Sequence, residues 1–217
     1  MVRAVEFLNP EIPRLLARGE GLRLELGGGK RRTPGFLSLD LVRGTQPDIL
    51  ADLNEPLTLL PDDSVAEVRT KHTLEHVEKL LPLLAELHRV VRPGGLIDVQ
   101  VPHFSNPYGY SDPTHVRFFG MYSFHYFSAP EDQPRRKVPS FYAAPRFRVE
   151  SVKVRLMKET WFERAVRTAL EPLANRSLAA LDRYERRWCR LFPANDIRYL
   201  LRPCKEAVGA APVRQAA

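Results

Sequence analysis

The chain has 217 residues, which is enough for one large domain or two small ones, and usual domain sizes favour one. Hydrophobic residues make up 44% and charged residues 27%, so the bulk of the chain is neither disordered nor collagen-like. No apolar run approaches the roughly 18 residues of a membrane span, and the N-terminal stretch lacks a signal-peptide core. Two cysteines, Cys189 and Cys204, cannot form a disulfide framework. These features predict a globular cytoplasmic protein.

Basic charge is concentrated in the C-terminal third. Residues 1–134 carry 14 basic and 18 acidic side chains, a net charge of −4, whereas residues 135–205 carry 18 and 7, a net charge of +11. This excess indicates either a solvated arginine-rich face or an acidic partner such as nucleic acid, anionic lipid or a phosphorylated substrate.

The first half of the chain reads as short strands separated by turns. Residues 22–26 alternate and run directly into Gly27, Gly28 and Gly29, which predicts a strand that ends in a tight turn. Further strands are predicted over residues 36–41, 48–53 and 65–71. The three- and four-residue spacing of apolar side chains then predicts a helix over residues 74–91.

The second half begins with a strand and a long insertion. The predicted elements are a strand at 95–103, an aromatic-rich insertion at 104–146, a strand at 147–156, helices at 159–171 and 172–190, and a strand at 197–203. Pro172 is expected to start the second helix, and residues 206–217 are expected to be a disordered tail. The pattern predicts one α/β domain over residues 1–205, with 104–146 as a lid and 159–191 as a helical cap.

The glycine turn is compatible with three kinds of nucleotide ligand. A phosphate-binding P-loop needs Ser or Thr after Lys30, but Arg31 stands there. A dinucleotide fingerprint needs glycine where Arg32 stands, and its acid about 20 residues further on. S-adenosylmethionine has no pyrophosphate, and Asp40 at the end of the second strand could accept both of its ribose hydroxyls. A ligand-free turn of glycines remains the alternative.

The segments LELGGG, FLSLDL, DILADLNEPLTLLPDDSVAEVRTKHTLEHV and HRVVRPGGLIDVQVPH resemble the small "type 11" class I S-adenosylmethionine-dependent methyltransferases. The resemblance covers about residues 22–119 and implies a Rossmann-like, mostly parallel sheet of seven strands with an antiparallel last strand. It implies S-adenosylmethionine as the cofactor. The residues that it assigns to cofactor binding are Glu25, Gly27, Gly28 and Gly29 at the methionine end, Asp40 at the ribose, Asp52 and Leu53 at the adenine, and His72 on the opposite side.

One departure from the family pattern concerns the loop after the glycines. The family has a further glycine where Arg31 stands, and the chain reaches Asp40 with almost no room for the usual first crossover helix. We therefore expect a shortened loop over residues 30–35 in its place.

The histidines suggest the acceptor chemistry. His103 ends a predicted strand, while Asp112 and His115 can converge across a turn; a histidine oriented by a carboxylate suits removal of a proton from a hydroxyl acceptor. The catalytic prediction is therefore His103, Asp112 and His115, with O-methylation of a small-molecule or saccharide-type acceptor. The aromatic residues predicted to wall its pocket are Tyr108, Tyr110, Phe118, Phe119, Tyr122 and Phe124.

Two other functions stay open. His72 and His76 lie four residues apart, but the string HTLEH is not HExxH and no cysteine is near, so we predict no metal site. A metal-dependent hydrolase using His72, His76 and His103 is nevertheless one alternative. A non-catalytic cofactor-binding partner subunit is the other.

The predicted helices at 159–191 are amphipathic and rich in arginine. Their apolar side is expected to cover the sheet or another subunit, as in a homodimer, and their basic side suits peripheral contact with anionic lipid. Nucleic acid is a less favoured partner, because no strip of arginine and aromatic residues lies on a predicted strand.

Overall fold

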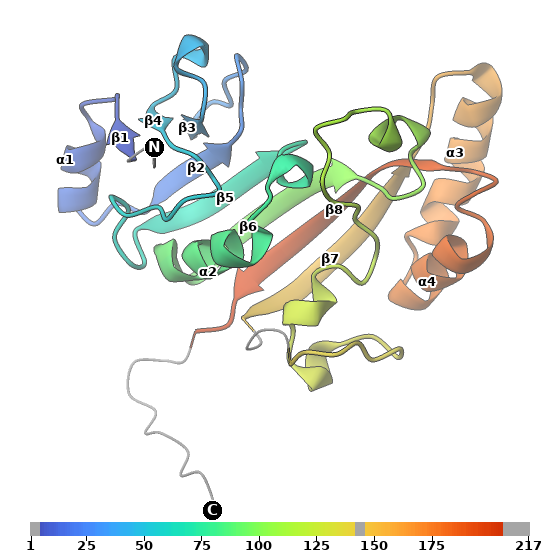
Figure 1. Cartoon of the computed structure of the whole chain (residues 1–217). Coiled ribbons are helices and arrows are strands. Elements are labelled where there is room, and N and C mark those ends of the chain that lie inside the picture. Colours follow the sequence, from blue (N-terminus) through green and yellow to red (C-terminus); the bar gives the residue numbers. More distant parts are fainter. Residues whose placement is uncertain (1–4, 142–145, 206–217) are drawn as a thin grey trace, which may run out of the picture.

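The computed structural model describes residues 5–141 and 146–205, which fold around a single sheet (Figure 1). Its strands are β1 (Glu6–Phe7), β2 (Leu22–Leu26), β3 (Leu37–Asp40), β4 (Ile49–Leu50), β5 (Val65–Lys71), β6 (Val91–Pro102), β7 (Phe147–Leu156) and β8 (Ala194–Pro203). The spatial order is β1-β4-β3-β2-β5-β6-β8-β7. Strands β4, β3, β2, β5 and β6 pair in parallel, and β8 is antiparallel to both β6 and β7. The mostly parallel sheet with an antiparallel last strand is thus confirmed.

The eighth strand is an addition to the predicted seven. It is β1, which pairs antiparallel with β4 through two residues, Glu6 and Phe7. A two-residue strand is too short to show alternation in the sequence, so its existence follows from tertiary pairing alone.

The helices are α1 (Ile12–Ala17), α2 (Leu80–Val90), α3 (Trp161–Ala174) and α4 (Leu178–Arg187). The prediction of one helix over 74–91 was wrong at its start, because Leu74–His76 form a 3-10 turn and Val77 is extended. The prediction that Pro172 starts a helix was also wrong. Pro172 lies in the last turn of α3, and the break comes later, where the Ser177 hydroxyl accepts the Ala180 N–H at 3.1 Å and so starts α4.

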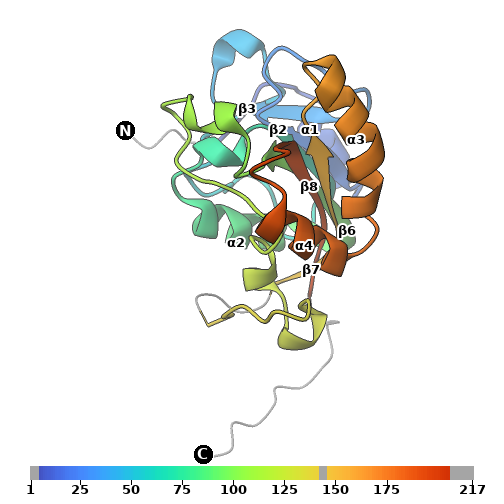
Figure 2. The same cartoon turned by 90° about the vertical axis from the view of Figure 1, so that its right-hand side faces the viewer.

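The two faces of the sheet differ in polarity. Alternate residues of β2 separate them: Leu22, Leu24 and Leu26 are buried in the core, whereas Arg23 is exposed and Glu25 half-buried. Helix α2 places Leu83, Leu84 and Leu87 in the same core. The two views in Figures 1 and 2 show α2 beside the sheet in both orientations. The opposite face of β2, β5, β6 and β8 carries charged side chains.

No helix joins β2 to β3, as the shortened loop predicted. Gly27 turns the chain with a φ of +64°, and a Cβ on it would lie 2.3 Å from the Thr73 hydroxyl oxygen. Glycine is therefore required there twice, by backbone conformation and by close approach. The turn after β2 consequently packs against the segment that follows β5.

Helix α3 protects the outer edge of the sheet. Asn175 accepts a hydrogen bond from the Val154 N–H and donates one to the Val154 carbonyl, both at 2.8 Å, and Glu171 accepts the Leu156 N–H at 2.8 Å. These side chains take the place of a further strand beside β7.

The aromatic insertion is built of turns rather than regular elements. It contains 3-10 turns at Pro107–Tyr110, His125–Phe127 and Pro130–Asp132. Four of its residues, 142–145, and the predicted tail at 206–217 lie outside the described residues. Within residues 5–141 and 146–205, the longest helices are too short and too polar to cross a membrane.

Candidate cofactor and acceptor site

A cavity of about 170 Å³ opens at the carboxyl ends of β2, β3 and β4. Four of the residues predicted to bind the cofactor line it, namely Gly27, Asp40, Asp52 and Leu53. The other lining residues are Leu39, Leu41, Ala51, Asn54, Thr73, His76 and Val77. Ligands of open α/β sheets bind at this end of the strands, and the mixed apolar and carboxylate lining suits a nucleoside.

Asp40 is held by the backbone around it. Its Oδ2 accepts the Gly29 N–H at 2.9 Å, and its Oδ1 accepts the Val42 N–H at 2.9 Å. Each carboxylate oxygen keeps a further lone pair. The carboxylate is therefore fixed in orientation and can still accept hydrogen bonds from the two hydroxyls of a ribose.

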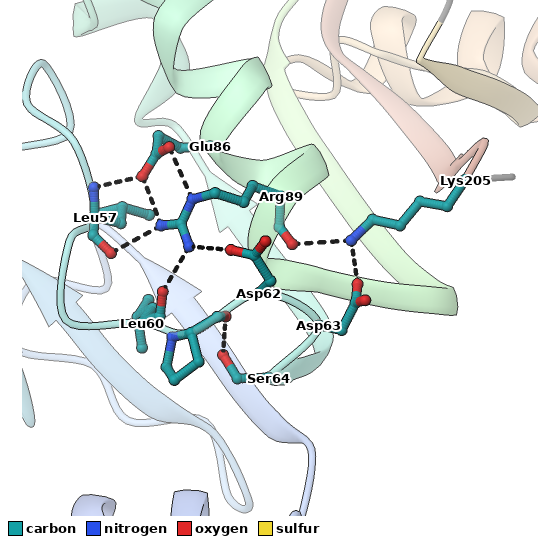
Figure 3. Close-up of polar contacts among 9 residues, drawn as sticks. Leu57, Leu60, Asp62, Asp63, Ser64, Glu86, Arg89 and Lys205 are labelled. Atoms are coloured by element: carbon teal, nitrogen blue, oxygen red, sulfur yellow. Dashed lines mark hydrogen bonds and ion pairs between the residues drawn. The ribbon is translucent and has the colours of Figure 1, made fainter. Parts of the chain in front are cut away.

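Asp52 and the segment behind it are tied to helix α2. Asp52 accepts hydrogen bonds from the Asn54 N–H at 2.9 Å and amide at 3.1 Å, and Asn54 accepts the Lys79 N–H at 3.0 Å. Further along, the Arg89 guanidinium contacts the Leu57 and Leu60 carbonyls and the Asp62 and Glu86 carboxylates (Figure 3). The hydrogen bonds from Arg89 lower the pKa of Glu86. This wall of the cavity is thus anchored.

Glu25 points to the other face of the sheet, where it accepts the Thr33 hydroxyl at 2.9 Å. A second cavity of about 550 Å³ lies there. It is lined by Glu25, Arg31, Arg32, Thr33, Arg69, Thr70, Lys71, Asp98, Gln100 and Arg198. Asp98 is bound by Arg198 through two hydrogen bonds of 2.5 and 2.6 Å. Five basic against two acidic side chains give this cavity a positive balance.

The remaining predicted cofactor residues line neither of these two cavities. Gly28 and Gly29 belong to the turn above the first one. His72 has a φ of +52°, and its ring lies between two buried carboxylates, 3.5 Å from Glu75 and 3.3 Å from Asp196.

His103 lies in a closed environment. Its side chain is fully buried, Nδ1 is 2.7 Å from the Ser105 hydroxyl and Nε2 is 3.1 Å from a Glu185 oxygen. With both ring nitrogens engaged by the protein, His103 has no nitrogen open to an acceptor. Among the described residues, no hydrogen bond or ion pair joins His103 to Asp112 or His115.

His115 and Asp112 lie near each other without a hydrogen bond between their side chains. The separation is 3.7 Å between His115 Nε2 and Asp112 Oδ2. Asp112 instead accepts the Thr114 hydroxyl at 2.6 Å and N–H at 2.9 Å, and these bonds lower its pKa. His115 Nδ1 lies 2.8 Å from the Gly109 carbonyl.

The structure brings His115 to His76, which the sequence argument did not pair. Their ring centroids are 4.7 Å apart, and the Val116 N–H donates to the Glu75 carbonyl at 2.9 Å. Glu75 and Thr73 were also missed. The string LEHV belongs to the segments that resemble the family, but a separation of about 40 residues hides its contact with residues 112–116 from any local pattern.

The predicted aromatic wall divides between several places. Phe118, Phe119 and Phe124 line an apolar cavity of about 530 Å³. Tyr110 stacks on Phe118 at 4.4 Å. The other two tyrosines lie outside that cavity: Tyr108 is exposed, and the Tyr122 hydroxyl donates to Asp182.

The family model described as "Methyltransferase domain" matches residues 34–98. This range includes β3, β4 and β5, and with them Asp40, Asp52 and His76. Over residues 34–98 the chain is thus similar to a methyltransferase domain, in agreement with the resemblance seen in the sequence.

Solved structures share the fold of this chain at low sequence identity. A SAM dependent methyltransferase from Archaeoglobus fulgidus is 18% identical with a TM-score of 0.53, covering 88% of this chain and 91% of that one. The YcgJ protein from Bacillus subtilis is 14% identical with a TM-score of 0.51, covering 90% and 98%. A Haloferax volcanii methyltransferase, solved in complex with the Trm112 methyltransferase activator, is 14% identical with a TM-score of 0.50, covering 88% and 87%. The comparison with curated proteins gives no match.

The residues at the first cavity fit S-adenosylmethionine, the cofactor that the methyltransferase match implies. Leu39, Ala51 and Leu53 offer an apolar seat for a base, and the fixed Asp40 carboxylate faces the same cavity. The turn at Gly27 and Gly29 has positive φ, and no protein atom within 4 Å would meet a Cβ on Gly29, so the backbone is open there.

Proposed function

We propose that this methyltransferase transfers a methyl group to an oxygen of a small polar acceptor of saccharide type. Bound S-adenosylmethionine supplies an electrophilic methyl group. The acceptor oxygen forms a bond to the methyl carbon while the bond from that carbon to sulfur breaks. The electron pair stays on sulfur, and the proton of the acceptor hydroxyl passes to Nε2 of His115.

The chain's own residues would hold the nucleoside at one end of the sheet. Asp40 would accept hydrogen bonds from the ribose hydroxyls, Asp52 and Leu53 would flank the adenine, and the glycine turn would face the methionine end. Asp40 carries this proposal, because the backbone N–H groups of Gly29 and Val42 fix its carboxylate at the cavity.

Two features support the proposal for the methyl acceptor, namely the second cavity and His115. Lys71 and Arg31 line the polar cavity, and the structure gives their side chains no ion pair among the described residues. They suit an acceptor that carries a carboxylate or phosphate as well as hydroxyls. The Gly109 carbonyl can only accept a proton, so a neutral His115 carries its proton on Nδ1 and its lone pair on Nε2. Through Nε2, His115 is proposed to accept the proton of the acceptor hydroxyl.

Calorimetric titration with S-adenosylmethionine and S-adenosylhomocysteine tests the cofactor site. We expect micromolar binding, about −8 kcal/mol, and at least a tenfold loss of affinity in Asp40→Asn with the unfolding temperature preserved. Asp48→Asn would be a poor control, because Asp48 binds Ser38 and Asn9 within the fold. The matched control is Glu131→Gln, because Glu131 is exposed on the insertion and has no ion pair among the described residues. Unchanged affinity in Asp40→Asn would contradict the assignment.

The acceptor class is tested by release of S-adenosylhomocysteine from a panel of neutral and anionic sugars. We expect turnover with anionic members, reduced by Lys71→Ala. Binding of the cofactor without turnover on any acceptor would favour the non-catalytic partner subunit instead.

Two further parts of the proposal concern the surroundings of the enzyme. The free thiols of Cys189 and Cys204 suit a reducing compartment, and we place the protein in the cytoplasm. The helices at 159–191 are proposed to touch anionic lipid, because they combine exposed aromatic side chains with unpaired arginines.

A further inference from the structure

We propose that Glu75, His76 and His115 form a binding site for one divalent transition-metal ion beside the cofactor cavity. One carboxylate oxygen and one ring nitrogen from each histidine all lie within 4.8 Å of one another. Ligands of a metal such as zinc sit about 2.0–2.2 Å from it, so they are roughly 3–4.4 Å apart. Small side-chain rotations therefore suffice to close the site.

The hydrogen bonds of the two histidines leave one nitrogen of each ring, Nε2, free to bind a metal. The Thr114 hydroxyl donates its only proton to Asp112 at 2.6 Å, so it can only accept from His76 Nδ1, which lies 2.9 Å away. The Gly109 carbonyl likewise only accepts from His115 Nδ1. In neutral rings both protons thus sit on Nδ1, and both Nε2 lone pairs are free. Orientation of metal-binding histidines by such an outer hydrogen bond is the usual arrangement.

Glu75 is a buried carboxylate without hydrogen bonds among the described residues. Its side chain is 1% exposed, and neither carboxylate oxygen has a hydrogen-bond partner in the described chain. The His72 ring at 3.5 Å is the neighbour that the structure gives it. A buried carboxylate without hydrogen bonds is costly, and a cation would satisfy it.

The framework that presents these ligands is rigid. The segments 75–78 and 114–117 are joined by the Val116 N–H to the Glu75 carbonyl at 2.9 Å and by Arg117 Nε to the Val77 carbonyl at 2.9 Å. Arg117 also donates to the Glu78 carbonyl. Ligands from two distant parts of the chain are thereby held close together.

Two imidazoles and one carboxylate favour zinc, iron, cobalt or manganese over calcium or magnesium. Three protein ligands also leave coordination positions open, as in catalytic rather than structural sites. His76 itself lines the cofactor cavity. Given the proposed function, a cation held there would lower the pKa of an acceptor hydroxyl that ligates it. With the metal bound, Nε2 of His115 would be a ligand and no longer the base, and the hydroxyl proton would pass to solvent.

The experiment measures metal binding directly, on chelator-treated full-length protein without a histidine tag and without S-adenosylmethionine. Titration with Co²⁺, followed by visible absorption, and with Zn²⁺, followed by calorimetry, should each give one equivalent per chain. His115→Gln and Glu75→Gln should each weaken binding by at least tenfold. The matched control is His88→Gln, since His88 contacts Cys204 and Phe147 elsewhere.

Thermal unfolding of the metal-free variants distinguishes loss of a metal ligand from loss of the folded structure. Glu75→Gln removes a buried charge, so its unfolding temperature should equal or exceed that of the wild type while metal binding is lost. Absence of Co²⁺ and Zn²⁺ binding by the wild type, or equal affinity in His115→Gln, would overturn the site. Because S-adenosylmethionine is titrated separately without metal, failure of this site and failure of the proposed function give different results.

Discussion

His125 is a buried histidine whose two ring nitrogens have no hydrogen-bond partner in the described chain. Burial disfavours the charged ring and lowers its pKa to about 4. Between pH 6.5 and 4 the unfolded chain therefore binds a proton that the folded chain does not. Since stability rises with pH wherever the unfolded state binds more protons, it falls on acidification through this range.

We predict that this histidine costs the fold up to about 3 kcal/mol as the pH drops from 6.5 to 4. Urea unfolding at a series of pH values measures it. His125→Leu should remove this pH dependence of the free energy of unfolding. The values for wild type and variant should therefore diverge as the pH falls. Parallel pH profiles of the two proteins would show that His125 does not titrate as described.

At the residue scale, the sequence singled out Asp40 and Gly27, which line the proposed cofactor cavity, but not the groups beside them. Asp40 and Gly27 stand at strand ends that alternation reveals. Glu75 was missed because its burial depends on the insertion, which returns to it from 40 residues away. The grouping of His103 with His115 relied on position along the chain, whereas Glu185 of α4 closes over His103.

At the element scale, Arg89 of α2 joins the segment behind the cofactor cavity to the helix (Figure 3). Its five hydrogen bonds to Leu57, Leu60, Asp62 and Glu86 measure 2.8–3.1 Å. A lysine at this position has one nitrogen and cannot reproduce the planar set. Sequence periodicity places Arg89 on the helix but gives no sign of this role.

We predict that Arg89→Lys lowers the free energy of unfolding by about 2 kcal/mol, because hydrogen bonds to charged groups are lost. The control is Arg92→Lys, since Arg92 is exposed and makes no ion pair in the described residues; it should change stability by less than about 0.5 kcal/mol. Denaturant titration of both variants decides. Equal effects would mean that Arg89 acts only through its charge.

Element boundaries were predicted well where one signal dominates. Alternation of apolar and polar residues located β2, β5 and β7. The short spacing from Gly29 to Asp40 predicted that no crossover helix joins β2 to β3. The boundaries of α2 and α3 were missed, because they depend on contacts such as Asn54 with Lys79 and Asn175 with Val154. Pro172 near a helix end also permits two interpretations, the start of one helix or the last turn of another.

At the scale of the whole molecule, the cap formed by α3 and α4 leaves apolar groups outside. Trp161 is 80% exposed and Phe162 54%. Arg167 and Arg186 are paired with Glu171 and Asp182 on their own helices. Exposed arginines of α4, Arg183 and Arg187, have no ion pair within the described chain. Aromatic and basic side chains on one segment are typical of helices that lie on an anionic membrane surface.

We predict that the protein sediments with vesicles containing phosphatidylglycerol and not with pure phosphatidylcholine, because each arginine near an anionic surface contributes about 1 kcal/mol. Raising the salt concentration should release it. The double variants Arg183→Gln/Arg187→Gln and Trp161→Ser/Phe162→Ser should each reduce binding, whereas Val42→Ser, an exposed apolar residue outside this segment, should not. Since screening weakens surface charges but not apolar insertion, binding that persists at high salt would assign the contact to the aromatic side chains alone. Absence of binding at low salt would instead leave the cap to another role, such as covering a second copy of this chain.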